Sequence, residues 1–268
     1  MGLRITPDNL FVQRQIGAST NRMQIGFRRL SSGLRITRAG EDAAGLAIAE
    51  GLRAGVLAAQ TERNNIQMAT SLVQTAEGGL AQTGDALQRL RELALQAGSG
   101  TLNDEQRAAI NEEAQQLIEQ INQNAETTEF NEINPLAGDV TEVEVGTEGG
   151  MTIAFEAATA EALGIADIDL TTAEGAQAAV GTIDAAIGQV NEFRGQLGAT
   201  QNALQSAGET RAIVAENLAA AESAIRDANM ALEATNLIRD QMLQRGGIAV
   251  LSQANIMPQN ALRLLGGT

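Results

Sequence analysis

Apolar residues recur at every seventh position in two long stretches of the chain, one in each half. The first stretch follows Leu52, Ala59, Ile66, Val73, Leu80, Leu87 and Ala94, with Ala69, Ala76, Leu90 and Ala97 at companion positions. Gly55, Glu62 and Thr83 interrupt it. A spacing of seven places side chains along one stripe of a helix, as in coiled coils. The sequence therefore predicts a long helix that packs against a partner helix along this stripe.

The second stretch begins near Ala176 and has a single charged member, Arg211. Its apolar members are Ile183, Val190, Leu197, Leu204, Leu218, Ile225 and Leu232. Prolines occur only at positions 7, 135 and 258, so helix is permitted throughout both intervals between them. Trp and Tyr are absent, and cores of Ala and Leu suit closely packed helices. The two stretches should pair with each other and bring the chain ends together.

Glycine, proline and alternation mark the bounds of the elements. We expect helices over about 43–98, 104–125 and 176–228, with an acidic excursion over 131–170. Within it, "VTEVEVGTEGGMTIAFE" alternates apolar and polar residues around a Gly-Gly pair, which predicts a β-hairpin near 139–157. The predicted fold class is mainly α: long paired N- and C-terminal helices in a coiled-coil or bundle rod, with one small hairpin.

Charge is distributed unevenly along a chain whose net charge is −15. Residues 1–40 hold seven arginines against Asp8, and residues 101–170 hold sixteen acids against Arg107. The N-terminal arginines are dispersed among apolar residues, and the chain has no Trp or Tyr for base stacking, which argues against nucleic acid as a partner. The acidic middle is typical of a solvated exterior.

The residue types needed for most catalytic sites are missing. The chain has no Cys and no His, and all 18 basic residues are arginine. Ser31 and Ser32 therefore have no His or Lys base, and the acid pairs Glu112-Glu113 and Asp167-x-Asp169 lack the spacing of a calcium loop. The sequence predicts no catalytic, cofactor or metal site and a protein that is not an enzyme.

Targeting signals are equally sparse. The first thirty residues show no secretory leader, and no apolar run reaches the length of a membrane span. We therefore expect no membrane insertion, and either a cytosolic location or export by a route without a cleaved leader.

Both terminal segments carry apolar residues at helical spacing that two helices alone would not bury. These residues are Leu10, Ile16, Met23, Phe27 and Leu30 at the N-terminal end, and Ile248, Leu251, Ile256, Leu262 and Leu265 at the C-terminal end. Apolar faces without a covering layer are candidates for burial in an assembly.

Several motifs, taken in order, resemble the terminal regions of bacterial flagellins. They are "RLSSGLRI", "EDAAGLAIAE", "RNNIQMATSLVQTAEGGL", "LQRLRELALQAGSGTL", "TEFN", "ENLAAAESAIRDANMA" and "LSQANIMPQNALRLL". The resemblance covers about residues 20–133 and 180–268. It implies an inner coiled-coil domain of residues 1–40 plus 229–268, a rod domain of residues 41–228, and no outer variable domain.

The resemblance also implies a function and a set of partners. Flagellins leave the cell unfolded through the flagellar type III export channel and polymerise beneath a cap into an extracellular filament used for motility. Expected partners are further copies of the chain, the export apparatus and export chaperone, and the cap and hook-filament junction proteins. The alternatives are a hook-filament junction protein of the same family, or a soluble helical scaffold or binding module.

Two sets of site residues follow. The four arginines around the Ser-Ser-Gly break, Arg28, Arg29, Arg35 and Arg38, are expected to meet carboxylates of neighbouring subunits. The resemblance further implies that Arg89, Leu93 and Glu113 stand where the vertebrate innate-immune flagellin receptor reads the family.

Overall fold

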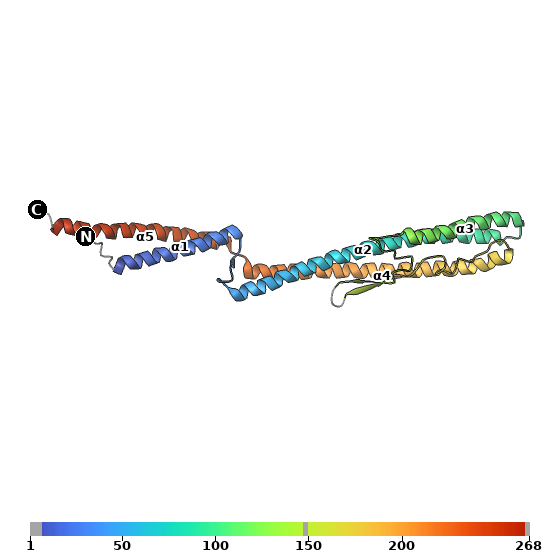
Figure 1. Cartoon of the computed structure of the whole chain (residues 1–268), viewed down its shortest axis with the longest axis horizontal. Helices are drawn as coiled ribbons and strands as arrows, with labels where there is room; N and C mark the ends of the chain where they lie inside the picture. Colours follow the sequence, from blue (N-terminus) through green and yellow to red (C-terminus); the bar gives the residue numbers. More distant parts are fainter. Residues whose placement is uncertain (1–6, 147–149, 266–268) are drawn as a thin grey trace. The chain divides into compact units, whose positions relative to one another are not determined.

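The computed structural model describes residues 7–146 and 150–265, with side chains described for 10–146, 150–254 and 256. In chain order the elements are α1 (Pro7–Ser32), α2 (Ala43–Ala97), α3 (Asp104–Thr127), β1 (Glu142–Val145), β2 (Met151–Ala154), α4 (Ala173–Arg226) and α5 (Met230–Leu265) (Figure 1). The mainly α fold with long terminal helices and one small hairpin, predicted from the sequence, is confirmed.

The chain divides into two compact units. We call residues 1–57 and 215–268 the terminal unit, and residues 58–214 the central unit. The expected boundaries near residues 40 and 229 coincide with the helix breaks between α1 and α2 and between α4 and α5. The terminal unit extends beyond those breaks and includes the first turns of α2 and the last turns of α4. These turns contact each other through Arg226 on α4, whose Nη1 lies 2.9 Å from Glu50 Oε1 on α2.

In the central unit α2 and α4 lie antiparallel. Arg91 on α2 contacts Asp184 on α4 with Nε and Oδ1 2.5 Å apart, and Gly84 faces Val190. Toward the other end of the unit Ile66 faces Gly208, so each step forward along α2 matches a step backward along α4. The predicted pairing of the two heptad stretches is confirmed, and their members Val73, Leu80, Leu87, Ile183, Val190, Leu197 and Leu204 are buried.

The polar residues that interrupt the heptads have partners. Glu62 on α2 and Arg211 on α4 face each other, with Arg211 Nε 2.7 Å from Glu62 Oε2. The Thr83 hydroxyl, 1% exposed, accepts a hydrogen bond of 2.9 Å from the Asn124 side-chain amide on α3. Glu62 and Arg211 therefore compensate each other across the α2–α4 interface, and Thr83 is satisfied by α3.

α3 packs against α2 as an antiparallel hairpin. The Asn124 amide also donates to the carbonyl of Gly79, where α2 and the segment after α3 approach closely. A Cβ at Gly79 would lie 2.6 Å from both Leu136 Cδ1 and Thr128 Oγ1. Only glycine leaves room for this contact.

The acidic excursion contains more core than its charge indicates. Its apolar residues Phe155, Leu163, Ile165 and Leu170 are buried, while its carboxylates lie outward. Amides of α3 bond its backbone: Asn122 accepts from Ala160 N–H, Asn111 accepts from Leu170 N–H, and Gln115 donates to the Ile168 carbonyl, all within 2.8–2.9 Å. The prediction that this region is a solvated exterior was wrong for its apolar residues, which are buried. The net charge of a segment does not show which of its individual residues are buried.

The predicted hairpin is confirmed. β1 and β2 are antiparallel, with Val143 opposite Ile153 and Val145 opposite Met151. Val145 and Ile153 are buried on the inner face, and Glu142 and Glu144 lie exposed on the other. The alternation in the sequence thus marks which face meets the helices.

Candidate assembly site

The terminal unit is built on α1 and α5, which pack antiparallel around a polar contact. The Ser19 hydroxyl donates to the Asp240 carbonyl at 2.9 Å, and Arg22 Nε donates to Asp240 Oδ1 at 3.0 Å. Ser19 and Asp240 are 1% and 8% exposed. Because both buried polar groups are bonded, they hold the two helices in one register.

Toward the C-terminal end of α1, the two helices are joined by an ion pair and border an open groove. Arg29 Nη1 lies 2.9 Å from Glu233 Oε1, and the same residues border a groove of about 540 Å³ between α1 and α5. The groove is lined by Arg22, Ile25, Gly26, Arg29, Glu233, Asn236, Leu237, Arg239, Asp240 and Leu243. Both of its carboxylates are already paired with arginines, which leaves no carboxylate for acid-base chemistry.

The predicted apolar stripes are only partly covered in the single chain. Leu10, Phe27, Ile248 and Ile256 are between 42% and 54% exposed. Ile16, Met23, Leu30 and Leu251 are half-buried. The side chains of Leu262 and Leu265 lie outside the described residues, although the helix α5 includes both positions.

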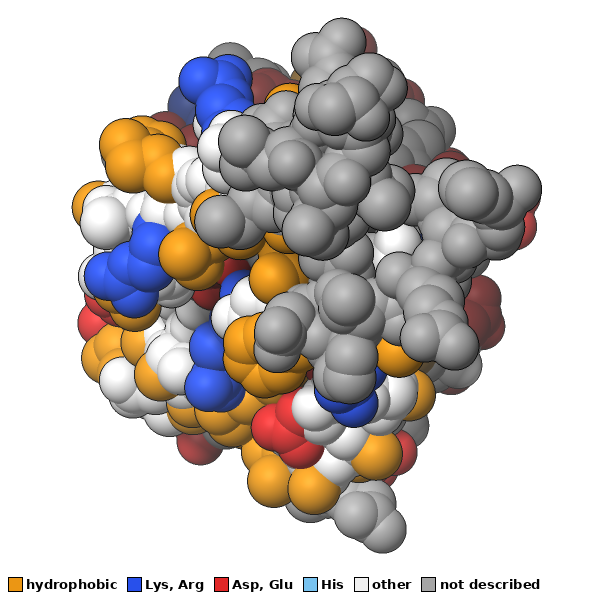
Figure 2. All heavy atoms as spheres, turned by 90° about the vertical axis from the view of Figure 1, so that its left-hand side faces the viewer, with side chains coloured by type: hydrophobic (Ala, Val, Ile, Leu, Met, Phe, Trp, Pro, Cys, Tyr) orange, Lys and Arg blue, Asp and Glu red, His pale blue; other side chains and the backbone are white. Residues whose placement is uncertain are grey.

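Further apolar residues on the same helices are exposed and were missed by heptad spacing. They are Phe11, Met230, Ile238, Met242, Leu243 and Val250. Leu232, a member of the second heptad stretch, is also exposed. Viewed along the chain from the end that carries the termini, hydrophobic and arginine side chains lie next to one another (Figure 2). Apolar residues occur on several faces of α5, which is typical of a helix that is covered by other elements on all sides. This distribution is the sequence signal from which the additional exposed residues could have been predicted.

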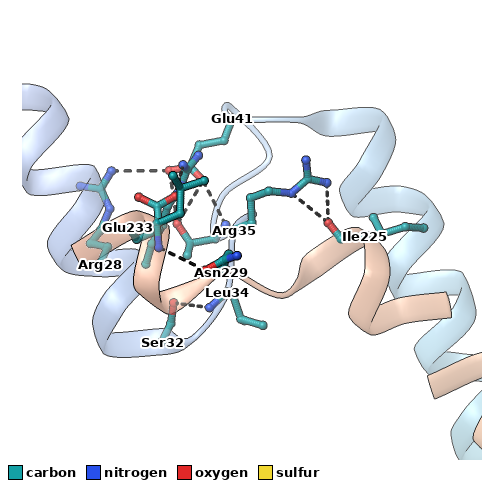
Figure 3. A network of polar contacts seen from close by, with 11 residues as sticks. Arg28, Ser32, Leu34, Arg35, Glu41, Ile225, Asn229 and Glu233 are labelled. Carbon is teal, nitrogen blue, oxygen red and sulfur yellow. Dashed lines mark hydrogen bonds and ion pairs between the residues drawn. The ribbon is translucent and has the colours of Figure 1, made fainter. Parts of the chain in front are cut away.

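A second feature of the terminal unit is the junction formed by two non-helical connectors, one between α1 and α2 and one between α4 and α5. Gly33 follows α1 with φ at +74°, a conformation that favours glycine. Arg35 N–H then donates to the Arg226 carbonyl at 2.6 Å, and Ala228 N–H donates to the Gly33 carbonyl at 2.9 Å. These two backbone bonds tie the α1–α2 connector to the α4–α5 connector. Figure 3 shows the side-chain contacts around the same junction, among them Arg35 with Ile225 and Arg28 with Glu41.

Side chains reinforce the junction. The Arg35 guanidinium donates two hydrogen bonds, of 2.6 and 3.2 Å, to the carbonyl of Ile225 in the last turn of α4. A cation is favourable at that end of a helix because its carbonyls carry partial negative charge. On the other side, Asn229 caps α5 by accepting from Leu232 N–H, and Asp42 caps α2 by accepting from Gly45 N–H.

Glu41 connects the junction to α1. Its carboxylate accepts from Thr37 N–H at 3.1 Å and lies 3.6 Å from Arg28 Nη2. The hydrogen bond from Thr37 N–H lowers the pKa of Glu41, and the charges of Arg29 and Arg28 lower it further. The Glu41 carboxylate therefore stays ionised to lower pH than an ordinary carboxyl.

The junction arginines mostly have partners within their own chain. Arg28 and Arg29 were expected to meet carboxylates of neighbouring subunits, and the carboxylates they contact are Glu41 and Glu233. The connector turns back after Gly33, which brings Glu41 beside α1. Arg35 bonds a carbonyl, and Arg38 is exposed without an ion-pair partner in the described part of the chain.

The three residues at the expected receptor position lie on the α2–α3 hairpin of the central unit. Arg89 contacts Glu113 at 2.8 Å and Glu92 at 3.0 Å, and the side chains of Arg89 and Glu113 are 50% and 48% exposed. The hydrogen bonds to Glu113 and then Glu92 raise the pKa of Arg89. Leu93 is 1% exposed, because it shares the buried stripe of Leu90 and Ala97 and packs inward.

Among the described residues, no three His, Cys, Asp or Glu side chains are placed to hold a metal ion. Over the same residues, none of the helices combines the length and the apolarity needed to cross a membrane.

Comparison with known proteins gives matches in both halves of the chain. The bacterial flagellin N-terminal helical region matches residues 9–141, and the bacterial flagellin C-terminal helical region matches residues 180–265. The flagellin of Halalkalibacterium halodurans is 41% identical over 258 residues, which is 94% of this chain and 95% of that protein. The flagellar filament 30.7 kDa core protein of Treponema maltophilum is 35% identical over 276 residues, 96% of this chain and 97% of that protein.

Solved structures agree in fold. The crystal structure of Bacillus cereus flagellin has a TM-score of 0.50 at 27% identity, and the match covers 55% of this chain and 88% of that one. A putative flagellar hook-associated protein from Vibrio parahaemolyticus has a TM-score of 0.59 at 13% identity, covering 69% and 99%, which shows a shared fold only. With both terminal regions matched in order and relatives similar along nearly the whole chain, this protein belongs to the bacterial flagellin family, whose members are structural subunits of the flagellar filament.

Proposed function

We propose that copies of this chain polymerise through the terminal unit into the extracellular filament, after export as an unfolded chain. The observation that carries the proposal is the exposed apolar surface of α1 and α5. Phe11 is 63% exposed and Met242 is 68% exposed, although their helices α1 and α5 pack against each other. Large apolar surfaces of this kind mark sites of protein-protein contact.

The polar contacts inside the terminal unit support the same proposal. The Ser19–Asp240 and Arg29–Glu233 contacts hold α1 and α5 together, so their outer apolar faces are presented as one surface. A surface that is arranged before binding loses less conformational entropy when it is buried.

Charge supports contacts between copies. By sequence the central unit holds 24 acids and 6 arginines, a balance of −18, whereas the terminal unit holds 9 acids and 12 arginines, a balance of +3. Arg38, exposed at the junction, and the exposed Arg35 have the charge to meet carboxylates of a neighbouring copy. The export apparatus, the export chaperone, the cap and the hook-filament junction proteins are proposed as partners from family membership.

The test is seeded polymerisation followed by sedimentation and negative-stain microscopy. A chain lacking residues 229–268 should keep its helical circular dichroism over the central unit and form no filaments. The double variant Ile238→Glu/Met242→Glu should fail in the same way, because it places charge on the exposed face of α5. Met68→Glu, at an equally exposed position in the central unit, is the matched control and should polymerise. Normal filaments from the truncated chain would overturn the proposal.

Recognition by the vertebrate flagellin receptor is proposed as a second role, favoured by the exposed Arg89–Glu113 pair. Leu93 would support the α2–α3 hairpin from beneath, since it is buried. In a receptor-reporter assay with purified monomer, Arg89→Ala and Glu113→Ala should reduce the response while circular dichroism stays unchanged. Silence of the unmodified protein at high concentration would exclude this role.

A further inference from the structure

The charged groups of this chain belong to only two pH ranges. The sequence has 18 basic residues, all arginine, and 33 acids, and it contains no Lys, His, Tyr or Cys. Carboxyl groups ionise near pH 4, whereas Lys and Tyr titrate near pH 10 and Arg only above about pH 12. Between about pH 6 and pH 12, therefore, no side chain of this protein changes its charge.

The structure places these arginines where elements are joined. Within the part of the chain that the structure describes, ion pairs link different elements or connectors at Arg22–Asp240, Arg28–Glu41, Arg29–Glu233, Arg226–Glu50, Arg91–Asp184, Arg211–Glu62 and Arg89–Glu113. The cation in each is a guanidinium. The packing of α1 on α5, of α2 on α4 and of α2 on α3 thus includes in each case an ion pair whose cation keeps its charge in alkali.

Guanidinium groups also donate hydrogen bonds to the carbonyls at two helix ends. Arg107, 9% exposed, donates to the Ala97 carbonyl at 3.1 Å and to the Ser99 carbonyl at 3.2 Å at the end of α2. Arg35 donates to the Ile225 carbonyl near the end of α4. A lysine at either position would lose its charge near pH 10, and with it the charge-assisted bonds to these carbonyls.

The paired arginines and the carboxylates limit the ion pairs at opposite ends of the pH scale. The contribution of a paired arginine is present below its pKa and is lost only as pH rises through that pKa, and carboxylates raise the pKa of Arg89 and Arg91 further. The contribution of the carboxylates is lost on the acid side, as pH falls through their pKa values. Between these limits the ion pairs persist together.

We infer that this protein is built to stay folded in an alkaline medium, with its ion pairs and the charges of its side chains unchanged from near neutral pH to about pH 12. This inference concerns the folded monomer and does not depend on polymerisation.

The test compares three forms of the full chain by thermal unfolding at 222 nm, between pH 7 and pH 11.5 at constant ionic strength. One form is unmodified. The interface variant carries Arg28→Lys, Arg29→Lys, Arg91→Lys and Arg226→Lys. The matched control carries Arg14→Lys, Arg53→Lys, Arg63→Lys and Arg194→Lys, at exposed arginines without ion-pair partners among the described residues.

The unfolding midpoint of the unmodified chain should stay constant across this range. The interface variant should lose about 5 °C or more above pH 10, and the control should lose clearly less although its net charge changes equally. A midpoint of the unmodified chain that falls as steeply as that of the interface variant would overturn the inference, and so would an interface variant as insensitive as the control. If the fourfold interface variant does not fold at pH 7, Arg91→Lys alone against Arg194→Lys gives the same comparison.

Discussion

At the scale of single residues, the turn that follows α3 holds an unusual backbone conformation. Asn131 and Glu132 adopt φ values of +50° and +65°, and Phe130 and Ile133 exchange two backbone hydrogen bonds of 2.9 and 3.0 Å across them. Asparagine tolerates this left-handed region, but a glutamate there has its Cβ close to the backbone carbonyl. Glu132 is therefore a strained position in an otherwise regular turn.

We expect Glu132→Gly to raise the free energy of unfolding by about 0.5–1 kcal/mol, because relief of strain exceeds the added entropy of the unfolded chain. Urea denaturation measures the change. Asp139→Gly is the matched control, since it removes one exposed acid nearby from a position whose φ is not positive. A Glu132→Gly protein no more stable than the Asp139→Gly protein would contradict the strain.

At the scale of elements, the α2–α4 interface combines two apolar stripes with one charged pair. Glu62 and Arg211 occupy heptad positions that would otherwise hold apolar residues, and they face each other. A polar pair at such positions specifies register, since sliding one helix by a turn would bury both charges against apolar side chains. The pair is partly exposed, with side chains 46% accessible for Arg211 and 19% for Glu62.

We expect Arg211→Leu alone to lower the free energy of unfolding by about 1 kcal/mol, because it leaves Glu62 facing an apolar side chain. The double variant Glu62→Leu/Arg211→Leu should recover that loss, because two leucines continue both stripes. Urea denaturation of the unmodified protein, the two single variants Glu62→Leu and Arg211→Leu, and the double variant completes a double-mutant cycle. A double variant no more stable than Arg211→Leu would show that the two residues do not act as a pair.

At the scale of the whole molecule, the two units differ in how much apolar surface they bury. The central unit holds a continuous core from α2, α3, the hairpin, the 155–170 segment and α4. The terminal unit rests on two helices with exposed apolar faces. Segments with few buried contacts open at low free energy, so the monomer should unfold locally at its ends first.

Limited digestion with trypsin, which can cleave this lysine-free chain only after arginine, checks this expectation. In the monomer, early cleavage should follow Arg14, Arg239 and Arg245, which are exposed. Cleavage after the buried Arg107 should come last, leaving a fragment that spans most of residues 58–214. Mass spectrometry identifies the fragments, and incorporation into filaments should protect the terminal sites. Cleavage after Arg107 as early as after Arg239 would contradict the difference between the units.

The sequence by itself determined the helices, the hairpin and the pairing of the two heptad stretches. These depend on periodicity and on turn residues, which act over a few neighbouring positions, and the extent of α2 from Ala43 to Ala97 follows from them almost to the residue. The apolar character of both chain ends was equally visible, because a surplus of apolar residues can be counted without knowing what covers it.

Only the tertiary structure decided which distant residues meet. It turned Glu41 back onto α1, so that Arg28 contacts its own chain, and it set Leu93 in the core beneath Arg89. It also bonded the backbone of the 160–170 segment to the amides of α3. The physical reason is the same in each case: burial and ion pairing depend on residues tens to hundreds of positions away, and no local pattern carries that information.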